Sequence, residues 1–237
     1  MNCPLKIKIC GLTSVEDVDA AAAAGADAVG FVFYRQSPRY VSPRMAAALA
    51  RRLPPLVSAV GLFVNAAAAD IEAALAAVPL NLLQFHGDES PEECERWQRP
   101  YIRAVRVTPG MNFLPYARRF ASARALLLDA FVEGYGGGGK TFDWSLIPSG
   151  LPLPLILSGG LTPENVGEAI RRTRPAAVDV SSGVESAKGV KDHRRMADFV
   201  AAARAEDRRQ RVEDSPLPGV KTHPQIQSDP QSLTTDP

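Results

Sequence analysis

The sequence is poor in the residues that anchor disulfide-rich, metal-binding and membrane proteins. Its 237 residues include only three cysteines and three histidines, so we expect neither a disulfide framework nor a metal site. No apolar run reaches the roughly 18–20 residues that cross a bilayer. The first residues enter a strand-like pattern without the apolar stretch of a signal peptide. These absences predict a cytoplasmic protein without a membrane partner.

An excess of charge of one sign is also lacking. The formal net charge is +1, and no cluster of lysine and arginine is interleaved with aromatic residues. A nucleic-acid partner is therefore not expected. The hydrophobic share of 46% is ordinary for a chain that buries a core. The length suits one domain of the size of an α/β barrel.

Short apolar or β-branched runs alternate with helical stretches rich in alanine, arginine and glutamate. The predicted strands are Leu5–Cys10, Ala28–Phe33, Val57–Phe63, Asn81–Phe85, Ile102–Val107, Ala125–Asp129, Leu153–Leu157 and Ala177–Val180. The predicted helices and turns are Val15–Ala24, Pro43–Leu53, Ala67–Val78, Pro91–Gln98, Phe113–Phe120, Trp144–Pro148, Pro163–Thr173 and Asp192–Ala205. Hydroxyl side chains are expected to cap four of the helices at Ser14, Ser42, Ser90 and Thr162, and proline follows the last three.

This alternation fits either a closed (β/α)8 barrel or an open, doubly wound sheet. The open sheet calls for a Gly-x-Gly-x-x-Gly turn after the first strand, but that strand ends in Cys10-Gly11-Leu12-Thr13. The glycine-rich segments instead follow the sixth, seventh and eighth strands, where barrels commonly bind phosphate. We therefore predict a single-domain (β/α)8 TIM barrel over residues 1–205.

The composition changes near Glu206. Residues 206–237 are rich in arginine, aspartate, glutamine and serine, and five prolines follow Asp214. Such a segment cannot bury a core of its own. We predict a disordered tail over residues 206–237, with a partner-binding tail as the alternative.

Cys10 ends the first predicted strand. Side chains alternate along a strand, so Lys6, Lys8 and Cys10 share one face while Ile7 and Ile9 share the other. The isoleucines suit the face covered by helices, which points Cys10 into the barrel at its catalytic rim. A strand cysteine is ordinarily a small buried hydrophobe. A neighbouring Lys8 that lowers the thiol pKa would instead favour a general base.

Other strand ends carry polar side chains. Asp129 follows three leucines, and such surroundings would raise its pKa toward that of a general acid, although a capping role is the alternative. Parity places His86 on the same face as Gln84, with a structural role as the alternative for the histidine. It places Asp179 on the inner face if the flanking valines pack against helices. Arg39, after the second strand, is placed to bind a substrate carboxylate or to be a solvated loop residue.

Small residues after the last three strands indicate a phosphorylated ligand. They let backbone N–H groups approach an anion closely. The candidate phosphate-binding residues are Gly137, Gly138, Gly159, Gly160, Ser182 and Gly183.

The strand-end segments resemble the phosphoribosylanthranilate isomerase family from about Leu5 to Ala203. Each segment alone is a weak indication of the family, but seven segments in the right order are highly specific. The segments are Lys8-Ile9-Cys10-Gly11, Gly25-Ala26-Asp27-Ala28-Val29-Gly30-Phe31-Val32-Phe33, Ser37-Pro38-Arg39-Tyr40-Val41, Gln84-Phe85-His86-Gly87, Gly139-Lys140-Thr141-Phe142-Asp143-Trp144, Leu157-Ser158-Gly159-Gly160-Leu161 and Asp179-Val180-Ser181-Ser182-Gly183-Val184-Glu185.

This resemblance implies an aldose–ketose isomerase of tryptophan biosynthesis that needs no cofactor. It implies an Amadori rearrangement of N-(5-phosphoribosyl)anthranilate in a monomer or homodimer. Asp129 would protonate the ribose ring oxygen, and Cys10 would remove the proton from C2. Arg39 would hold the anthranilate carboxylate, while His86 and Asp179 line the pocket.

One departure from the family motifs accompanies the resemblance, and two rival classes remain, namely other phosphosugar barrels and a non-catalytic barrel. Gly138 stands where the family usually has serine or threonine, which removes a possible hydroxyl contact. Among other phosphosugar barrels, indole-glycerol-phosphate synthase would need lysine and glutamate at several strand ends, and a pentose-phosphate epimerase would need a metal cluster. A non-catalytic barrel that senses a phosphorylated metabolite would need neither Cys10 nor Asp129.

Overall fold

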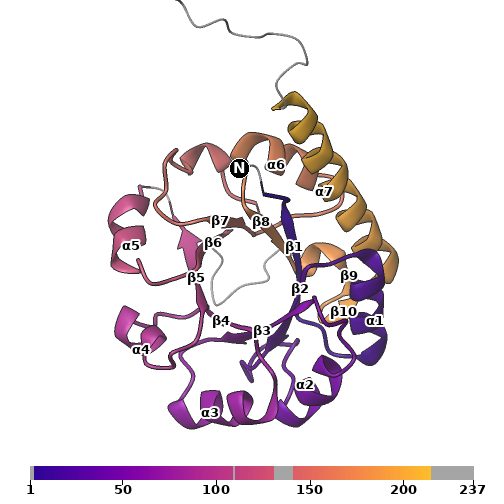
Figure 1. The fold of residues 1–237 in the computed structure, drawn as a ribbon, viewed down its shortest axis with the longest axis vertical. Coiled ribbons are helices and arrows are strands. Elements are labelled where there is room, and N and C mark those ends of the chain that lie inside the picture. The colour runs from indigo at the N-terminus through magenta and orange to yellow at the C-terminus, as the bar shows by residue number, and fades with distance from the viewer. Residues whose placement is uncertain (1–2, 109, 131–140, 215–237) are drawn as a thin grey trace, which may run out of the picture.

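The computed structural model describes residues 3–108, 110–130 and 141–214, and eight parallel strands in it close into one barrel in sequence order (Figure 1). The predicted (β/α)8 barrel is confirmed, and the open sheet is excluded. The barrel strands are β1 (Lys6–Cys10), β2 (Ala28–Val32), β3 (Ser58–Phe63), β4 (Leu82–Phe85), β5 (Tyr101–Val107), β6 (Ala125–Ala130), β7 (Leu155–Leu157) and β8 (Ala177–Val180).

Helices form the outer ring around these strands (Figure 1). They are α1 (Val15–Ala24), α2 (Pro43–Ala50), α3 (Ala68–Ala77), α4 (Pro91–Glu95), α5 (Phe113–Arg119), α6 (Val166–Thr173) and α7 (His193–Glu213), with short 3₁₀ turns η1 (Trp144–Leu146) and η2 (Ser182–Val184). After η2, β9 (Glu185–Ala187) and β10 (Val190–Lys191) form a small antiparallel pair. No helix of the described residues is long and apolar enough to cross a membrane.

Three of the four predicted helix caps are confirmed. The hydroxyls of Ser14, Ser42 and Ser90 each accept a hydrogen bond from the backbone N–H three residues later. The prediction at Thr162 is wrong, because α6 begins only at Val166. Asn165 closes the intervening turn by accepting from the Thr162 N–H at 2.8 Å and donating to the Gly160 carbonyl at 2.9 Å.

The last helix is longer than the sequence indicated. Helix α7 was predicted to end at Ala205 but continues to Glu213. Glu206 is buried, Asp207 accepts from the Leu5 N–H at 3.3 Å, and Gln210 donates to the Ile170 carbonyl at 3.2 Å. The first part of the predicted tail therefore belongs to the barrel, and residues 215–237 lie outside the described residues.

The two faces of the strands bury different side chains. Ile7 and Ile9 on β1 join the large apolar core between barrel and helices, whereas Lys8 and Cys10 point inward. The floor of the barrel interior is apolar, and a polar layer lies above it at the strand ends. The floor consists of Ile102, Ala104, Ala125, Leu127 and Ile156, with Leu82 and Ala177 packed against it.

Candidate active site

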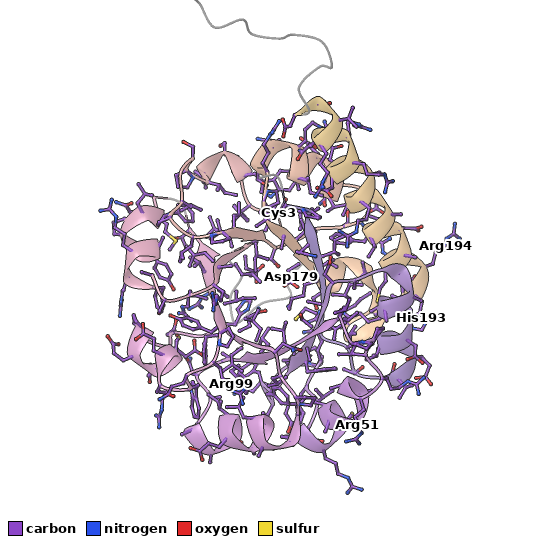
Figure 2. The ribbon with its side chains drawn as sticks, viewed as in Figure 1. Cys3, Arg51, Arg99, Asp179, His193 and Arg194 are labelled. Carbon is purple, nitrogen blue, oxygen red and sulfur yellow. The ribbon has the colours of Figure 1, made fainter. Side chains whose placement is uncertain are left out.

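A buried ion pair lies beside Cys10 on the inner face of the barrel. The Nζ of Lys8 is 2.8 Å from Oδ1 of Asp179, and both side chains are almost fully buried. Ser158, from the end of β7, donates to the other carboxylate oxygen of Asp179 at 3.5 Å. Figure 2 shows Asp179 within the ring of strands. Parity therefore placed Lys8, Cys10 and Asp179 correctly on one face.

Lys8 lowers the pKa of the Cys10 thiol as predicted, but the net shift of that pKa is upward. Burial raises the pKa of the Cys10 thiol above its usual value, and the negative charge of Asp179 adds to this rise. Lys8 and, more weakly, Lys191 lower the pKa but do not compensate. For Lys8, burial opposes the ammonium form, yet Asp179 and Cys10 outweigh it and raise the pKa of this lysine. Burial therefore outweighs the two lysines in setting the direction of the Cys10 pKa shift.

A strand glycine makes room for the thiol. Gly30 on β2 is the register partner of Cys10 on β1. A Cβ atom on Gly30 would stand 2.6 Å from the Cys10 Sγ, closer than two such atoms can approach. The position of Cys10 therefore depends on the absence of a side chain on the neighbouring strand.

Arg39 belongs to a second buried network, beside the first. Its Nε and Nη2 donate to the two carboxylate oxygens of Glu185 at 2.7 and 2.8 Å. Lys191 donates to the same carboxylate at 2.8 Å and to the Ser181 carbonyl at 2.9 Å. The Ser181 hydroxyl in turn donates to the Cys10 carbonyl at 3.0 Å. Arg39 is thus a buried, oriented cation rather than a solvated loop residue.

Across the mouth, a hydrogen-bonded chain leads to Asp129. Gln84 Nε2 lies 3.0 Å from His86 Nδ1, and His86 Nε2 lies 3.2 Å from Asp129 Oδ2. All three side chains are buried and come from β4, its C-terminal end and β6. Gln84 and His86 therefore share a face as predicted, and the structure joins His86 directly to Asp129.

Two loops at the same rim present backbone N–H groups. Gly159 and Gly160 follow β7 with φ values of 80° and 64°, which favour glycine. A Cβ on Gly159 would meet the Ala130 nitrogen at 2.3 Å, and one on Gly183 would meet the Leu161 carbonyl oxygen at 1.8 Å. Among the described residues, the turn and loop hydrogen bonds include none donated by the N–H groups of Gly159, Gly160, Ser182 or Gly183. Gly137 and Gly138 lie outside the described residues.

Sequence reasoning missed three charged residues at this rim. Glu185 begins β9 and Lys191 ends β10, and Arg106 on β5 is the register partner of Asp129. Parity along β5 could have placed Arg106 on the inner face, where its neighbours Ala104 and Ile102 lie. Nothing in the spacing of Glu185 and Lys191 indicated that they reach Arg39, which is 146 positions from Glu185. The described residues contain no group of three or more potential metal ligands.

Comparison with known proteins identifies the family. The family profile described as N-(5'phosphoribosyl)anthranilate (PRA) isomerase matches residues 7–202. The N-(5'-phosphoribosyl)anthranilate isomerase of Dechloromonas aromatica is 63% identical over 202 residues, which cover 85% of this chain and 97% of that protein. The chain belongs to this isomerase family. The enzyme of the same name from Methylibium petroleiphilum is also 63% identical, over 86% of this chain and 96% of its own.

Solved isomerase structures share the whole barrel. Phosphoribosyl anthranilate isomerase from Thermotoga maritima superposes with a TM-score of 0.79 at 44% identity, covering 85% of this chain and 99% of its own. A structure of the enzyme in complex with reduced 1-(o-carboxyphenylamino)-1-deoxyribulose 5-phosphate has a TM-score of 0.76 at 41% identity, with the same coverage. The isomerase class and barrel fold expected from the sequence are thereby confirmed.

Proposed function

We propose that the polar rim of this barrel converts N-(5-phosphoribosyl)anthranilate to 1-(2-carboxyphenylamino)-1-deoxyribulose 5-phosphate in the cytoplasm, without a cofactor. The observation that carries the proposal is that Cys10 and Asp129, from strands on different sides of the barrel, both end on its inner face above the apolar floor. One acid and one base facing a common space suit a rearrangement that protonates one atom and deprotonates another.

Asp129 acts first in the proposed reaction. Its carboxylic acid donates a proton to the ribose ring oxygen, the bond from that oxygen to C1 breaks, and the nitrogen lone pair forms a C=N bond to C1. The substrate is then an open-chain Schiff base with a positive charge on nitrogen. Gly159 keeps the space beside Asp129 open, since a Cβ there would lie 2.9 Å from Oδ1.

Cys10 acts second. Its thiolate removes the proton from C2, the electrons of the C–H bond form a C1–C2 double bond, and the positive charge on nitrogen is neutralised. The enolamine then gains a proton at C1 and loses one from the C2 hydroxyl, which yields the ketone. Lys8 and Lys191 favour the thiolate, and they are therefore the groups that support the base.

The remaining polar groups hold the two ends of the substrate. Arg39 keeps Nη1 without a hydrogen-bond partner among the described residues while Glu185 fixes its other two nitrogens, so this nitrogen suits the anthranilate carboxylate. The N–H groups of Gly159, Gly160, Ser182 and Gly183 suit the phosphate. We assign Gly137 and Gly138 to the same phosphate site from the sequence alone. His86 and Asp179 line the space between the two ends.

The proposed assembly is a monomer or a homodimer. One solved relative, 40% identical with a TM-score of 0.72, is described as monomers generated from the dimeric phosphoribosylanthranilate isomerase of Thermotoga maritima. Sedimentation of the full chain over a range of concentrations distinguishes the two states.

The experiment that tests the proposal is turnover of freshly generated phosphoribosylanthranilate, followed by its fluorescence. We expect activity in the native protein and a loss of ~10²–10⁴-fold in kcat for Cys10→Ala and for Asp129→Asn, since each removes one proton-transfer group. Cys3→Ala is the matched control, because Cys3 is exposed. An inactive native protein would refute the function, whereas full activity in either active-site variant would refute that residue's role.

A further inference from the structure

Gln84 has a buried polar atom that the steps above leave unexplained. Its side chain on β4 is fully buried, and Nε2 lies 3.0 Å from His86 Nδ1. Its Oε1 has no hydrogen-bond partner among the described residues. Because buried polar atoms are almost always paired, a glutamine here is costly, and an apolar residue of the same size would avoid the cost. The one contact that the amide makes is therefore its distinguishing feature.

That contact decides where the proton of His86 lies. An amide nitrogen only donates, so Nδ1 of the imidazole must accept. The proton of the neutral ring is then on Nε2, which faces Asp129 Oδ2 at 3.2 Å. An imidazolium ring would carry a second proton on Nδ1, directly opposite the N–H of Gln84. The amide therefore opposes the charged ring and selects the Nε2–H tautomer.

The charge on His86 matters to its partner. An imidazolium beside Asp129 would hold the carboxyl group in its ionised form, which cannot donate a proton. A neutral ring instead donates its Nε2–H to Oδ2, which leaves Oδ1 as the oxygen that carries a transferable proton. We propose that Gln84 is a positioning residue that keeps His86 neutral in the Nε2–H tautomer, so that the proton shared by this pair resides on Asp129. This inference rests on the proposed role of Asp129 as the acid.

The other charged groups around His86 do not replace this contact. From β5, Arg106 shares the inner face with Asp129, and Arg103 donates to the Phe85 and Gly87 carbonyls on either side of His86. Arg103 is paired with Glu89, which also accepts from the Gly87 N–H. On its other side, β3 contributes only apolar residues and Ser58. Gln84 is thus the residue in contact with Nδ1, whereas Arg103 acts on this segment through the backbone carbonyls.

The first test is nitrogen-15 NMR of the histidine rings in the ligand-free, full-length protein. The chain has only three histidines, so a spectrum of His86→Asn assigns the His86 signals by their loss. We expect a proton on Nε2 and none on Nδ1 at neutral pH. In Gln84→Glu, a carboxylate faces Nδ1, and we expect a proton on both nitrogens. A native ring protonated on Nδ1, or an unchanged ring in Gln84→Glu, would overturn the proposal.

The second test is the pH profile of turnover in the same variants. In Gln84→Glu the shared proton moves to the ring, so we expect kcat to fall about tenfold or more and the alkaline limb to shift to higher pH, with little change in KM. Gln84→Met, which loses the donor but keeps the size, should show the same changes more weakly. A purely structural role would lower activity without moving the limb, and that result would overturn the proposal.

A matched control separates this role from general damage. Gln210→Glu makes the same chemical change on α7, where the amide donates to the Ile170 carbonyl, and it should change neither the His86 signals nor the profile. If the native protein were inactive but His86 carried its proton on Nε2 as expected, the proposed function would be refuted. The acid role of Asp129, on which this inference rests, would be refuted with it. A wrong tautomer in an active protein would refute the inference alone.

Discussion

The acidity of the Cys10 thiol depends on its burial and on two neighbouring charges. Burial and Asp179 raise its pKa, while Lys8 lowers it. Because the base is the thiolate, activity should rise with pH through the thiol pKa and be lost as pH falls below it. Burial and the two flanking charges together therefore set the lower end of the active pH range.

Replacing Lys8 and replacing Asp179 should shift the pKa of Cys10 in opposite directions. Lys8→Met removes the favourable cation and should raise the pKa further, whereas Asp179→Asn should lower it. The measurement is thiolate absorbance at 240 nm against pH, corrected with the same variant carrying Cys10→Ala. Cys94 cancels in this difference, and burial raises its pKa to about 12. Each change breaks a buried ion pair at a cost of ~3–5 kcal/mol, so circular dichroism must first show that the variants fold. Shifts of the same sign would contradict the electrostatic explanation.

At the residue scale, strand parity predicted the site well. Alternation is a local property, so it placed Cys10 and Asp179 on the inner face, and the end of an apolar strand placed Asp129 at the rim. It could not give the sign of the Cys10 pKa shift, because burial depends on the packed barrel. Strand parity also could not predict the bidentate pair between Arg39 and Glu185, because that contact joins distant segments of the chain.

At the scale of elements, the approach of β1 and β2 depends on Gly30. Gly30→Ala would place a Cβ 2.6 Å from the Cys10 Sγ and must displace one of them. We expect kcat/KM to fall about tenfold, because a small misplacement of a catalytic group is costly, and the protein to lose about 1–3 kcal/mol of stability by overpacking. Steady-state kinetics and urea unfolding measure the two effects.

Gly61 on β3 provides the matched control for this strand pair. A Cβ on Gly61 would meet Leu80 at 2.6 Å on the outer, helix-facing side of the sheet. Gly61→Ala should therefore lower stability by a similar amount while kcat stays near that of the native protein. Equal losses of activity in both variants would show that overpacking anywhere in the sheet, and not the displacement of Cys10, causes the effect.

Element boundaries show where sequence prediction lost accuracy. Serine caps gave the starts of α1, α2 and α4, because a hydroxyl three residues before a free N–H is a local signal. The start of α6 was missed because Asn165 folds back on the turn before it. The end of α7 was missed because a charged, proline-poor continuation has no local stop signal, and its stability comes from contacts with the barrel.

At the scale of the whole molecule, α7 fastens the end of the barrel to its beginning. Beyond Ala205 it supplies the buried Glu206, a carboxylate at Asp207 that accepts a hydrogen bond from the Leu5 N–H, and an ion pair of Asp214 with Arg174 at 2.8 Å. A chain that ends at Ala205 should therefore unfold at a lower temperature than one that ends at Asp214, by several degrees for a loss of about 2 kcal/mol. Calorimetry of the two truncated proteins measures this, and equal midpoints would contradict it.

The apolar floor formed by β5, β6 and β7 affects how substrate enters the barrel and how product leaves it. Ile102, Leu127 and Ile156 seal the interior beneath the polar layer, as packed side chains do in barrels of this size. Because the interior is closed below, the aldose substrate enters and the ketose product leaves through the same open end of the barrel. The two sugars compete for the same binding site, so a ketose that has not been consumed inhibits the enzyme. Flux through the step therefore depends on how quickly the next enzyme removes the ketose, as well as on the supply of aldose.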